Sequence, residues 1–212
     1  MSCRLKGNKV VITLPANVTG DLSPILKDFE QWVWDTVPHD APVRNIVFEQ
    51  GDKIAIMGKD LEVVHRIGDV NTVQIVSDYF QITRVSQDIS VLTLVTNFLR
   101  KILYERALEK THEYAEILGV PNPRITIKAL SSSLGISSTR TGNFSVAICL
   151  VFAPMSVIDY ICAHCIANFK YASNPGSDFW VCLEEIFPLH REAEQWIEDN
   201  RRVFSIYDLA KV

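Results

Sequence analysis

The sequence predicts an α+β protein with a mainly β region over residues 1–90 and a helix-rich domain over residues 91–212. Short β-branched runs separated by Gly, Asp, Asn and Pro fill the first region. Near Val91 the hydrophobic period changes from two residues to about 3.6, which indicates helices. A chain of 212 residues that is 48% hydrophobic can bury one good core, with or without a small satellite domain.

Strands are expected in the first region wherever β-branched residues cluster. The runs are KVVITL, RNIVFEQ, KIAIMG, LEVVHRI, TVQIVS and YFQITRV. Between the first two, SPILKDFEQWVWDTV has helical spacing, and we expect its Trp32 and Trp34 to pack in a core or an interface.

A long helix opens the second region. From Val91 to Leu118 one stripe is apolar and the opposite face is charged, and Gly119 is expected to cap the C-terminus. Two strands should follow, over residues 123–130 and 143–153, joined by a serine-rich connection. The helical pattern resumes after Pro154 and again over residues 177–187 and 190–203. Three aromatic residues are expected to form a buried cluster: Phe179, Trp180 and Trp196.

Composition excludes several classes of function. The formal charge is −4 and the Lys and Arg residues are scattered among acidic ones, so no nucleic-acid groove is expected. The odd set of five cysteines, several in apolar context, indicates buried reduced thiols and therefore the cytoplasm. The longest apolar tract is interrupted by Pro154, Asp159 and His164, so a membrane span is not expected, and no secretory signal is visible.

One stretch, IDYICAHCIANFKYASNPGSDFW, begins like the helix of a zinc protease. A catalytic zinc needs three protein ligands and an open position for water, and HExxH supplies two of the ligands and the base. His164 keeps the first ligand position, but Cys165 replaces the base and Asn168 replaces the second ligand. The sequence therefore predicts no bound metal and no catalytic residue.

The C-terminal eighty or so residues resemble the YgjP-like metallopeptidase family, relatives of the SprT-like proteins within the zincin fold. The stretches that carry the resemblance are SSSLGISSTRTGNFSVAICLVFAP and VIDYICAHCIANFKYASNPGSDFWVCLEEIFPLHREAEQWI. The matching framework positions are Gly135, Gly142, Asn143, Ala153, Pro154, Asp159, Tyr160, Phe179, Trp180, Pro188 and Trp196. The resemblance implies a zincin-like domain over residues 91–212 and, in the family, a zinc cofactor.

The same resemblance implies that the chemistry has degenerated. The family's third histidine should fall at Ser173 or Asn174, and no histidine lies between His164 and His190. Where the family has the motif KSRWGSCS, residues 131–138 read SSSLGISS, without its basic residues, tryptophan and cysteine.

Other site chemistries are weaker. A thiolate zinc site would have to gather Cys162, His164 and Cys165, whose side chains diverge on a helix. A Cys165 nucleophile would need a histidine base, and the sequence does not show which histidine lies near it. His112 is followed by Glu113 but has Glu116 at the fifth position, which favours a solvated helix face. The acidic residues of the C-terminal helices, Glu194 among them, are interleaved with arginines and are expected to face water.

Two functional hypotheses follow. The first is a metal-dependent hydrolase homologue that has lost zinc and catalysis and acts as a binding or scaffold protein, with an extended peptide pairing along an expected edge strand at residues 144–152. The alternative is an active metal-dependent peptidase that takes its ligands from elsewhere, for example His164 with His190 or a carboxylate. The missing Glu and His favour the first.

Overall fold

The structure is a computed structural model that describes residues 2–6, 9–13, 48–130, 133–171, 176–200 and 204. The chain divides into two compact units, residues Met1–Arg44 and Asn45–Val212. In the first unit β1 (Ser2–Lys6), which the sequence analysis did not predict, pairs antiparallel with β2 (Lys9–Thr13). The predicted helix around Trp32 and Trp34 lies outside the described residues.

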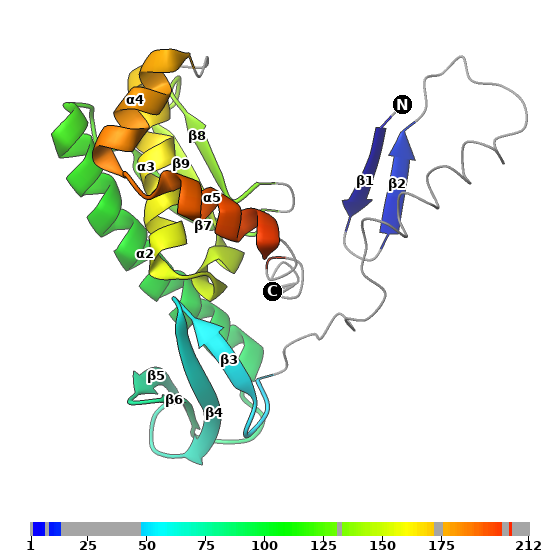
Figure 1. The fold of residues 1–212 in the computed structure, drawn as a ribbon. Helices are drawn as coiled ribbons and strands as arrows, with labels where there is room; N and C mark the ends of the chain where they lie inside the picture. Colours follow the sequence, from blue (N-terminus) through cyan, green and yellow to red (C-terminus); the bar gives the residue numbers. More distant parts are fainter. Residues whose placement is uncertain are drawn as a thin grey trace, which may run out of the picture. The chain divides into compact units, whose positions relative to one another are not determined.

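The second unit begins with a four-stranded sheet (Figure 1). Its strands are β3 (Lys53–Ile56), β4 (Lys59–Ile67), β5 (Thr72–Val76) and β6 (Tyr79–Arg84), in the order β3-β4-β6-β5. β4 and β6 are parallel, and the other two pairings are antiparallel. These four strands confirm the prediction.

The predicted strand at residues 44–50 is wrong where the structure describes it. Residues 48–50 form no strand, and Phe48 has a positive φ of 53°. This backbone turns the ring of Phe48 inward, where it is almost fully buried against Phe80 with ring centroids 5.9 Å apart. Burial of the ring, rather than strand pairing, decides the local conformation.

Helix α2 (Val91–Leu118) has the predicted bounds and runs beside both sheets of this unit and α3 (Figure 1). At its N-terminus the Ser90 side chain accepts a hydrogen bond from Thr93 N at 3.4 Å. At its C-terminus Gly119 adopts the left-handed conformation, φ 64°, as predicted. Its buried stripe repeats every three or four residues and includes Val95, Leu99, Leu103, Ala107, Thr111, Tyr114, Ala115 and Leu118.

A three-stranded sheet of order β7-β9-β8 follows. Its members are β7 (Arg124–Lys128), β8 (Gly135–Ser138) and β9 (Asn143–Ala147), with β9 parallel to β7 and antiparallel to β8. The predicted strand at residues 143–153 stops at Ala147, and Ile148–Phe152 forms the 3-10 helix η1. The expected edge strand at residues 144–152 is therefore wrong, because β9 is the central strand and β8 is an edge.

Three helices complete the unit: α3 (Met155–Tyr171), α4 (Ser177–Ile186) and α5 (His190–Asp199). All three were predicted, although α5 ends before residue 200 and residues 201–203 lie outside the described part. Met57 N, at the tip of the β3–β4 hairpin, donates a hydrogen bond to Val151 O at 2.7 Å. Gly58 of the same turn lies so close to Pro154 that a Cβ would be 3.3 Å from Pro154 Cα. The small sheet thus contacts the segment that leads into α3.

The α+β class is confirmed, with strands in the N-terminal half and helices after them. The predicted boundary at residue 90 falls inside the second compact unit, and as a domain boundary it stays a prediction. Among the described residues no helix is both long and apolar enough to span a membrane.

Candidate functional site

Helix α3 carries the residues of the predicted site, and a partly buried ion pair fixes it against α2. Arg106 donates from Nε to Asp159 Oδ1 at 2.9 Å and from Nη2 to Asp159 Oδ2 at 2.6 Å. Such a two-pronged contact is the strongest geometry available to an arginine and a carboxylate. Asp159, one of the framework residues of the resemblance, therefore holds α3 in place and does not face the cleft described below.

The edge strand β8 lies directly on α3 because residue 135 is a glycine. A Cβ at Gly135 would stand 2.8 Å from Ile161 Cγ2 and 3.2 Å from Cys165 Sγ. Real Cβ atoms essentially never show a contact as short as the first, so a larger residue at position 135 would require Ile161 or β8 to shift. Cys165, the residue in the position of the family's base, is consequently almost fully buried under β8.

His164 faces a cleft and is bonded along its own helix. Asn168 Nδ2 lies 3.3 Å from His164 Nδ1, so the amide donates and the imidazole accepts. The rings of Tyr160 and Phe179 contact His164 edge-on, with centroids 5.8 Å and 5.1 Å away. Burial lowers the pKa of His164, and the nearby Glu194 carboxylate opposes that shift. The imidazole is therefore held in its neutral form.

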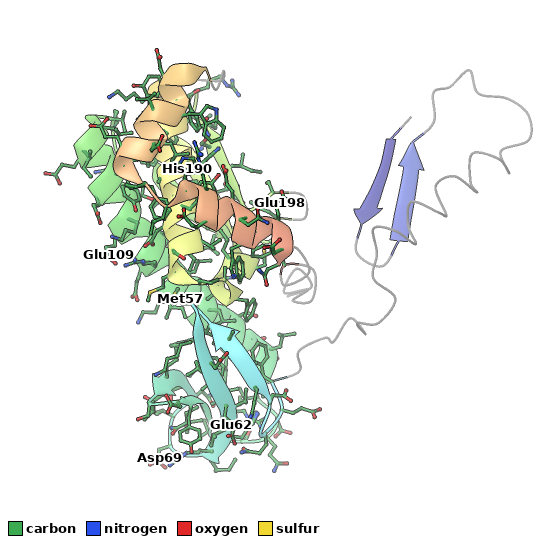
Figure 2. All side chains as sticks on the ribbon, viewed as in Figure 1. Met57, Glu62, Asp69, Glu109, His190 and Glu198 are labelled. Atoms are coloured by element: carbon green, nitrogen blue, oxygen red, sulfur yellow. The ribbon has the colours of Figure 1, made fainter. Side chains whose placement is uncertain are left out.

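Glu194 of α5 contacts Tyr160 of α3 and lies near His190 of its own helix. Its Oε1 accepts a hydrogen bond from the Tyr160 hydroxyl at 2.7 Å, and burial together with this bond raises the pKa of Tyr160. Its Oε2 lies 3.9 Å from Nδ1 of His190, which is only 5% exposed. Figure 2 shows His190 at the N-terminal end of α5 and Glu198 towards the other end of that helix. Glu194 was predicted to face water; its side chain is 38% exposed and also links α5 to α3.

Together these elements enclose an open cleft of about 700 Å³. α3 forms its floor, the start of β8 one wall and α5 the other. Its lining residues are Leu134, Gly135, Tyr160, Ile161, His164, Cys165, Arg191, Glu194, Gln195, Ile197 and Glu198. The α5 side chains recur every three or four residues, and this spacing is the sequence signal that could have identified the wall.

The described residues do not fit a catalytic metal. No group of three or more His, Cys, Asp or Glu side chains within the described ranges could hold an ion. The Nδ1 atom of His164 is bonded to an amide, and Glu194 is engaged by Tyr160. Ser173 and Asn174, the expected places of the third ligand, lie outside the described residues. No step of a metal-dependent reaction can be derived for this arrangement.

The cysteines do not replace the metal centre either. Cys149, Cys162, Cys165 and Cys182 are free and buried. Burial raises the pKa of Cys149 to about 11 and that of Cys162 to about 12, so both stay protonated thiols. Cys162 lies near Thr111 and Asp159 at the α2 side of the helix, whereas His164 lines the cleft.

The predicted aromatic cluster is only partly buried. Phe179 is 2% exposed, but Trp180 is 40% exposed, which corrects the expectation of burial. Trp196 is partly buried against the core. Trp180 lies on the outer side of α4, where its ring contacts His190 with centroids 5.9 Å apart. Adjacent helical residues point about 100° apart, so Phe179 and Trp180 cannot both face the core.

Comparison with known families identifies the class of protein as metallopeptidase-like. The family description "YgjP-like, metallopeptidase domain" matches residues 1–200. The chain belongs to this family, as the resemblance in its C-terminal half implied.

Other comparisons add little. None of the curated proteins compared matches the chain. Among solved structures, a match is the crystal structure of the metallopeptidase zymogen of Pyrococcus abyssi abylysin, at 22% identity and a TM-score of 0.41. The match covers 45% of this chain and 95% of that one.

Proposed function

We propose that this YgjP-like chain has lost zinc binding and hydrolysis and acts as a binding or scaffold protein. The observation that carries the proposal is the hydrogen bond between Asn168 and His164, because it occupies an imidazole nitrogen with an amide where a second ligand would stand. A single neutral imidazole is too few ligands for a stable zinc site. Membership of the family accounts for the fold, but a fold alone does not imply activity.

The proposed ligand is an extended peptide that adds a strand to β8. Ala147 N donates to Leu134 O at 2.9 Å, which marks this pair as hydrogen-bonded. Bonded and non-bonded pairs alternate in an antiparallel ladder, so the backbone groups of Gly135 and Ser137 point away from β9. A peptide bonded to them would lie beside the cleft between β8 and α5. Strand addition uses backbone groups and requires no metal.

Peptide binding is tested by removing one backbone donor. Peptides enriched from a random phage-displayed library on the full chain are synthesised and titrated by calorimetry into the parent, Ser137→Pro and Ser137→Ala. Proline removes the N–H of residue 137, which points away from β9, and leaves the hydrogen bonds between β8 and β9 in place. Ser137→Pro should therefore weaken peptide binding at least about tenfold. Ser137→Ala loses the same hydroxyl but keeps the N–H and should bind as the parent does. Equal binding by all three would contradict strand addition.

Loss of the metal is tested by elemental analysis of chain purified without chelator. The parent should carry no stoichiometric zinc. About one zinc per chain, lost in His164→Ala, would instead support the alternative of a metal-dependent peptidase with ligands from elsewhere.

The converse experiment restores the ligands. Asn168→His places an imidazole one turn from His164, Cys165→Glu supplies the base, and Ser173→His or Asn174→His supplies the third ligand. Such variants should gain zinc but show weak or no peptidase turnover, because the groups that orient each ligand are missing. If folded variants bind no zinc with either third histidine, Asn168 does not stand at a former ligand position.

We also propose a reducing, cytoplasmic location, which the four buried free thiols support. Cell fractionation with an antibody to the chain checks it, and recovery in a secreted fraction would contradict it.

A further inference from the structure

Exposed apolar side chains are concentrated around one hairpin, far from the cleft residues in sequence. Of the fourteen large hydrophobic side chains that are exposed among the described residues, six lie between Ile67 and Val85. They are Ile67, Val70, Ile75, Val76, Tyr79 and Val85. Such a concentration marks an interaction surface more often than scattered single residues do.

The outer strand of this hairpin, β5, contacts α2 but is an edge of its sheet. Among the described residues β5 pairs only with β6, and its sequence TVQIV has no charge and no proline. Natural edge strands are commonly blunted by lysine, proline or a bulge. The edge strand β3 at the other side of the same sheet begins with Lys53, whereas β5 carries no such device.

The hairpin geometry sets which backbone groups of β5 are free. A two-residue turn, Ser77 and Asp78, closes the pair Val76 and Tyr79. In a hairpin with such a turn the closing pair is hydrogen-bonded, and bonded pairs then alternate along the ladder. The N–H and C=O groups of Val73 and Ile75 therefore point away from β6.

We propose that β5 pairs antiparallel with β5 of a second copy of this chain, about a two-fold axis at Gln74. In this register Val73 of one copy stands opposite Ile75 of the other, and each such pair exchanges two hydrogen bonds, giving four in all. Gln74 of one copy stands opposite Gln74 of the other, in a non-hydrogen-bonded pair whose side chains lie close together. The strand is thus complementary to itself in backbone bonding and in side-chain size.

Electrostatics favour a second copy over a charged partner. The strand brings no charged side chain to its own copy, and the nearest carboxylates, Asp69 and Asp78, lie beyond its two ends (Figure 2 labels Asp69). In the antiparallel register Asp69 approaches Asp78 of the second copy. Lys59 Nζ lies 3.6 Å from Asp78 and donates to Ser77 O at 2.5 Å, so it offsets that repulsion. One short strand forms a small interface, so the dimer is weak and depends on concentration.

The test uses the full chain in sedimentation velocity from about 10 μM to about 1 mM, where weak interfaces of this size associate. The parent should shift from monomer towards dimer over this range. Gln74→Lys and Gln74→Glu each place like charges face to face and should weaken dimerisation about fivefold or more. An equimolar mixture of the two variants should recover the dimer, because opposite charges then meet at the axis. Ile136→Lys adds the same charge to the edge strand β8 and should dimerise as the parent does.

Hydrogen exchange of the parent checks the register without any variant. Exchange of the Val73 and Ile75 amides should slow as protein concentration rises. A parent that stays monomeric at about 1 mM overturns the proposal, as does a mixture of the Gln74 variants that fails to recover the dimer. Amides of β5 that are protected equally at all concentrations in a monomer overturn it too, since another segment of the same chain would then cover the edge.

Discussion

At the scale of single residues, His164 is a histidine whose protonation is opposed by its surroundings. Phe179 and Tyr160 flank its ring, and Asn168 donates to its Nδ1 atom. An amide donor can serve only the neutral imidazole at that nitrogen, because the protonated ring would present a second donor there. His164 therefore contributes a dependence of stability on pH.

The sign of that dependence follows from the lowered pKa of His164. Below about pH 6.5 the unfolded chain binds a proton at this residue that the folded chain resists, so the free energy of unfolding should fall as the pH falls through that value and recover above it. His164→Gln should flatten this part of the profile, measured by urea unfolding from about pH 5 to pH 8. His112→Gln, a solvent-exposed histidine on α2, is the control and should leave the profile unchanged. A parent profile that is already flat across pH 6.5 would contradict the prediction.

The neighbouring aromatic residues Phe179 and Trp180 differ in burial and should differ in stability effect. Phe179→Ala empties a fully buried site and should cost about 3–5 kcal/mol. Trp180→Ala removes a ring that keeps 40% of its surface exposed and should cost about 1–2 kcal/mol. Chemical denaturation of both variants compares the two values. A larger loss in Trp180→Ala would show that its contact with His190 matters more than burial.

The sequence predicted His164 and Asn168 as altered site positions but not the role of Glu194. The first two follow a spacing that is visible along one helix. The bond between Tyr160 and Glu194 joins two residues thirty-four positions apart, on α3 and α5, and no local pattern reveals which carboxylate of an acidic stretch bonds to another helix. Residues whose partners lie on the same element were predictable, and those whose partners lie on another were not.

At the scale of elements, the contact of β8 with α3 depends on a missing side chain. Gly135→Ala places a Cβ within 2.8 Å of Ile161 Cγ2 and should destabilise the fold by about 1–3 kcal/mol. Ile161→Ala removes the clashing methyl group. The Gly135→Ala/Ile161→Ala pair should therefore cost less than the sum of its single changes, measured as a double-mutant cycle of urea unfolding. Strict additivity would mean that β8 simply moves away from the helix.

Long elements with a regular pattern of buried positions were predicted most accurately. The bounds of α2 were predicted correctly because its buried residues recur every three or four positions over many turns and a glycine ends it. β9 and η1 form one continuous buried apolar run, so nothing in the sequence marks where the strand becomes a 3-10 helix. β8 was missed because GISS has neither apolar alternation nor β-branched enrichment. Its position is set by packing on α3.

At the scale of the whole molecule, stability should not depend on a metal. The core runs from Phe48 through the two sheets to α3, α4 and α5 and consists of hydrophobic side chains. Adding a chelator should leave the melting temperature of the parent unchanged, measured by scanning calorimetry. A restored variant with Asn168→His, loaded with zinc, is the control and should lose stability on chelation through linkage. A drop of several degrees in the parent would show that an ion binds its native state.

The hairpin tip at Met57 and Gly58 also decides how the chain melts. It bonds to Val151 and packs on Pro154, which precedes α3, so residues 48–90 cannot detach without exposing the beginning of that helix. Melting of the small sheet then removes contacts that the helices need, so the second unit should melt in a single calorimetric transition. A protein shortened to begin at residue 91 would lack this buttress and should behave as an expanded, protease-sensitive chain, even though it retains every residue of the cleft.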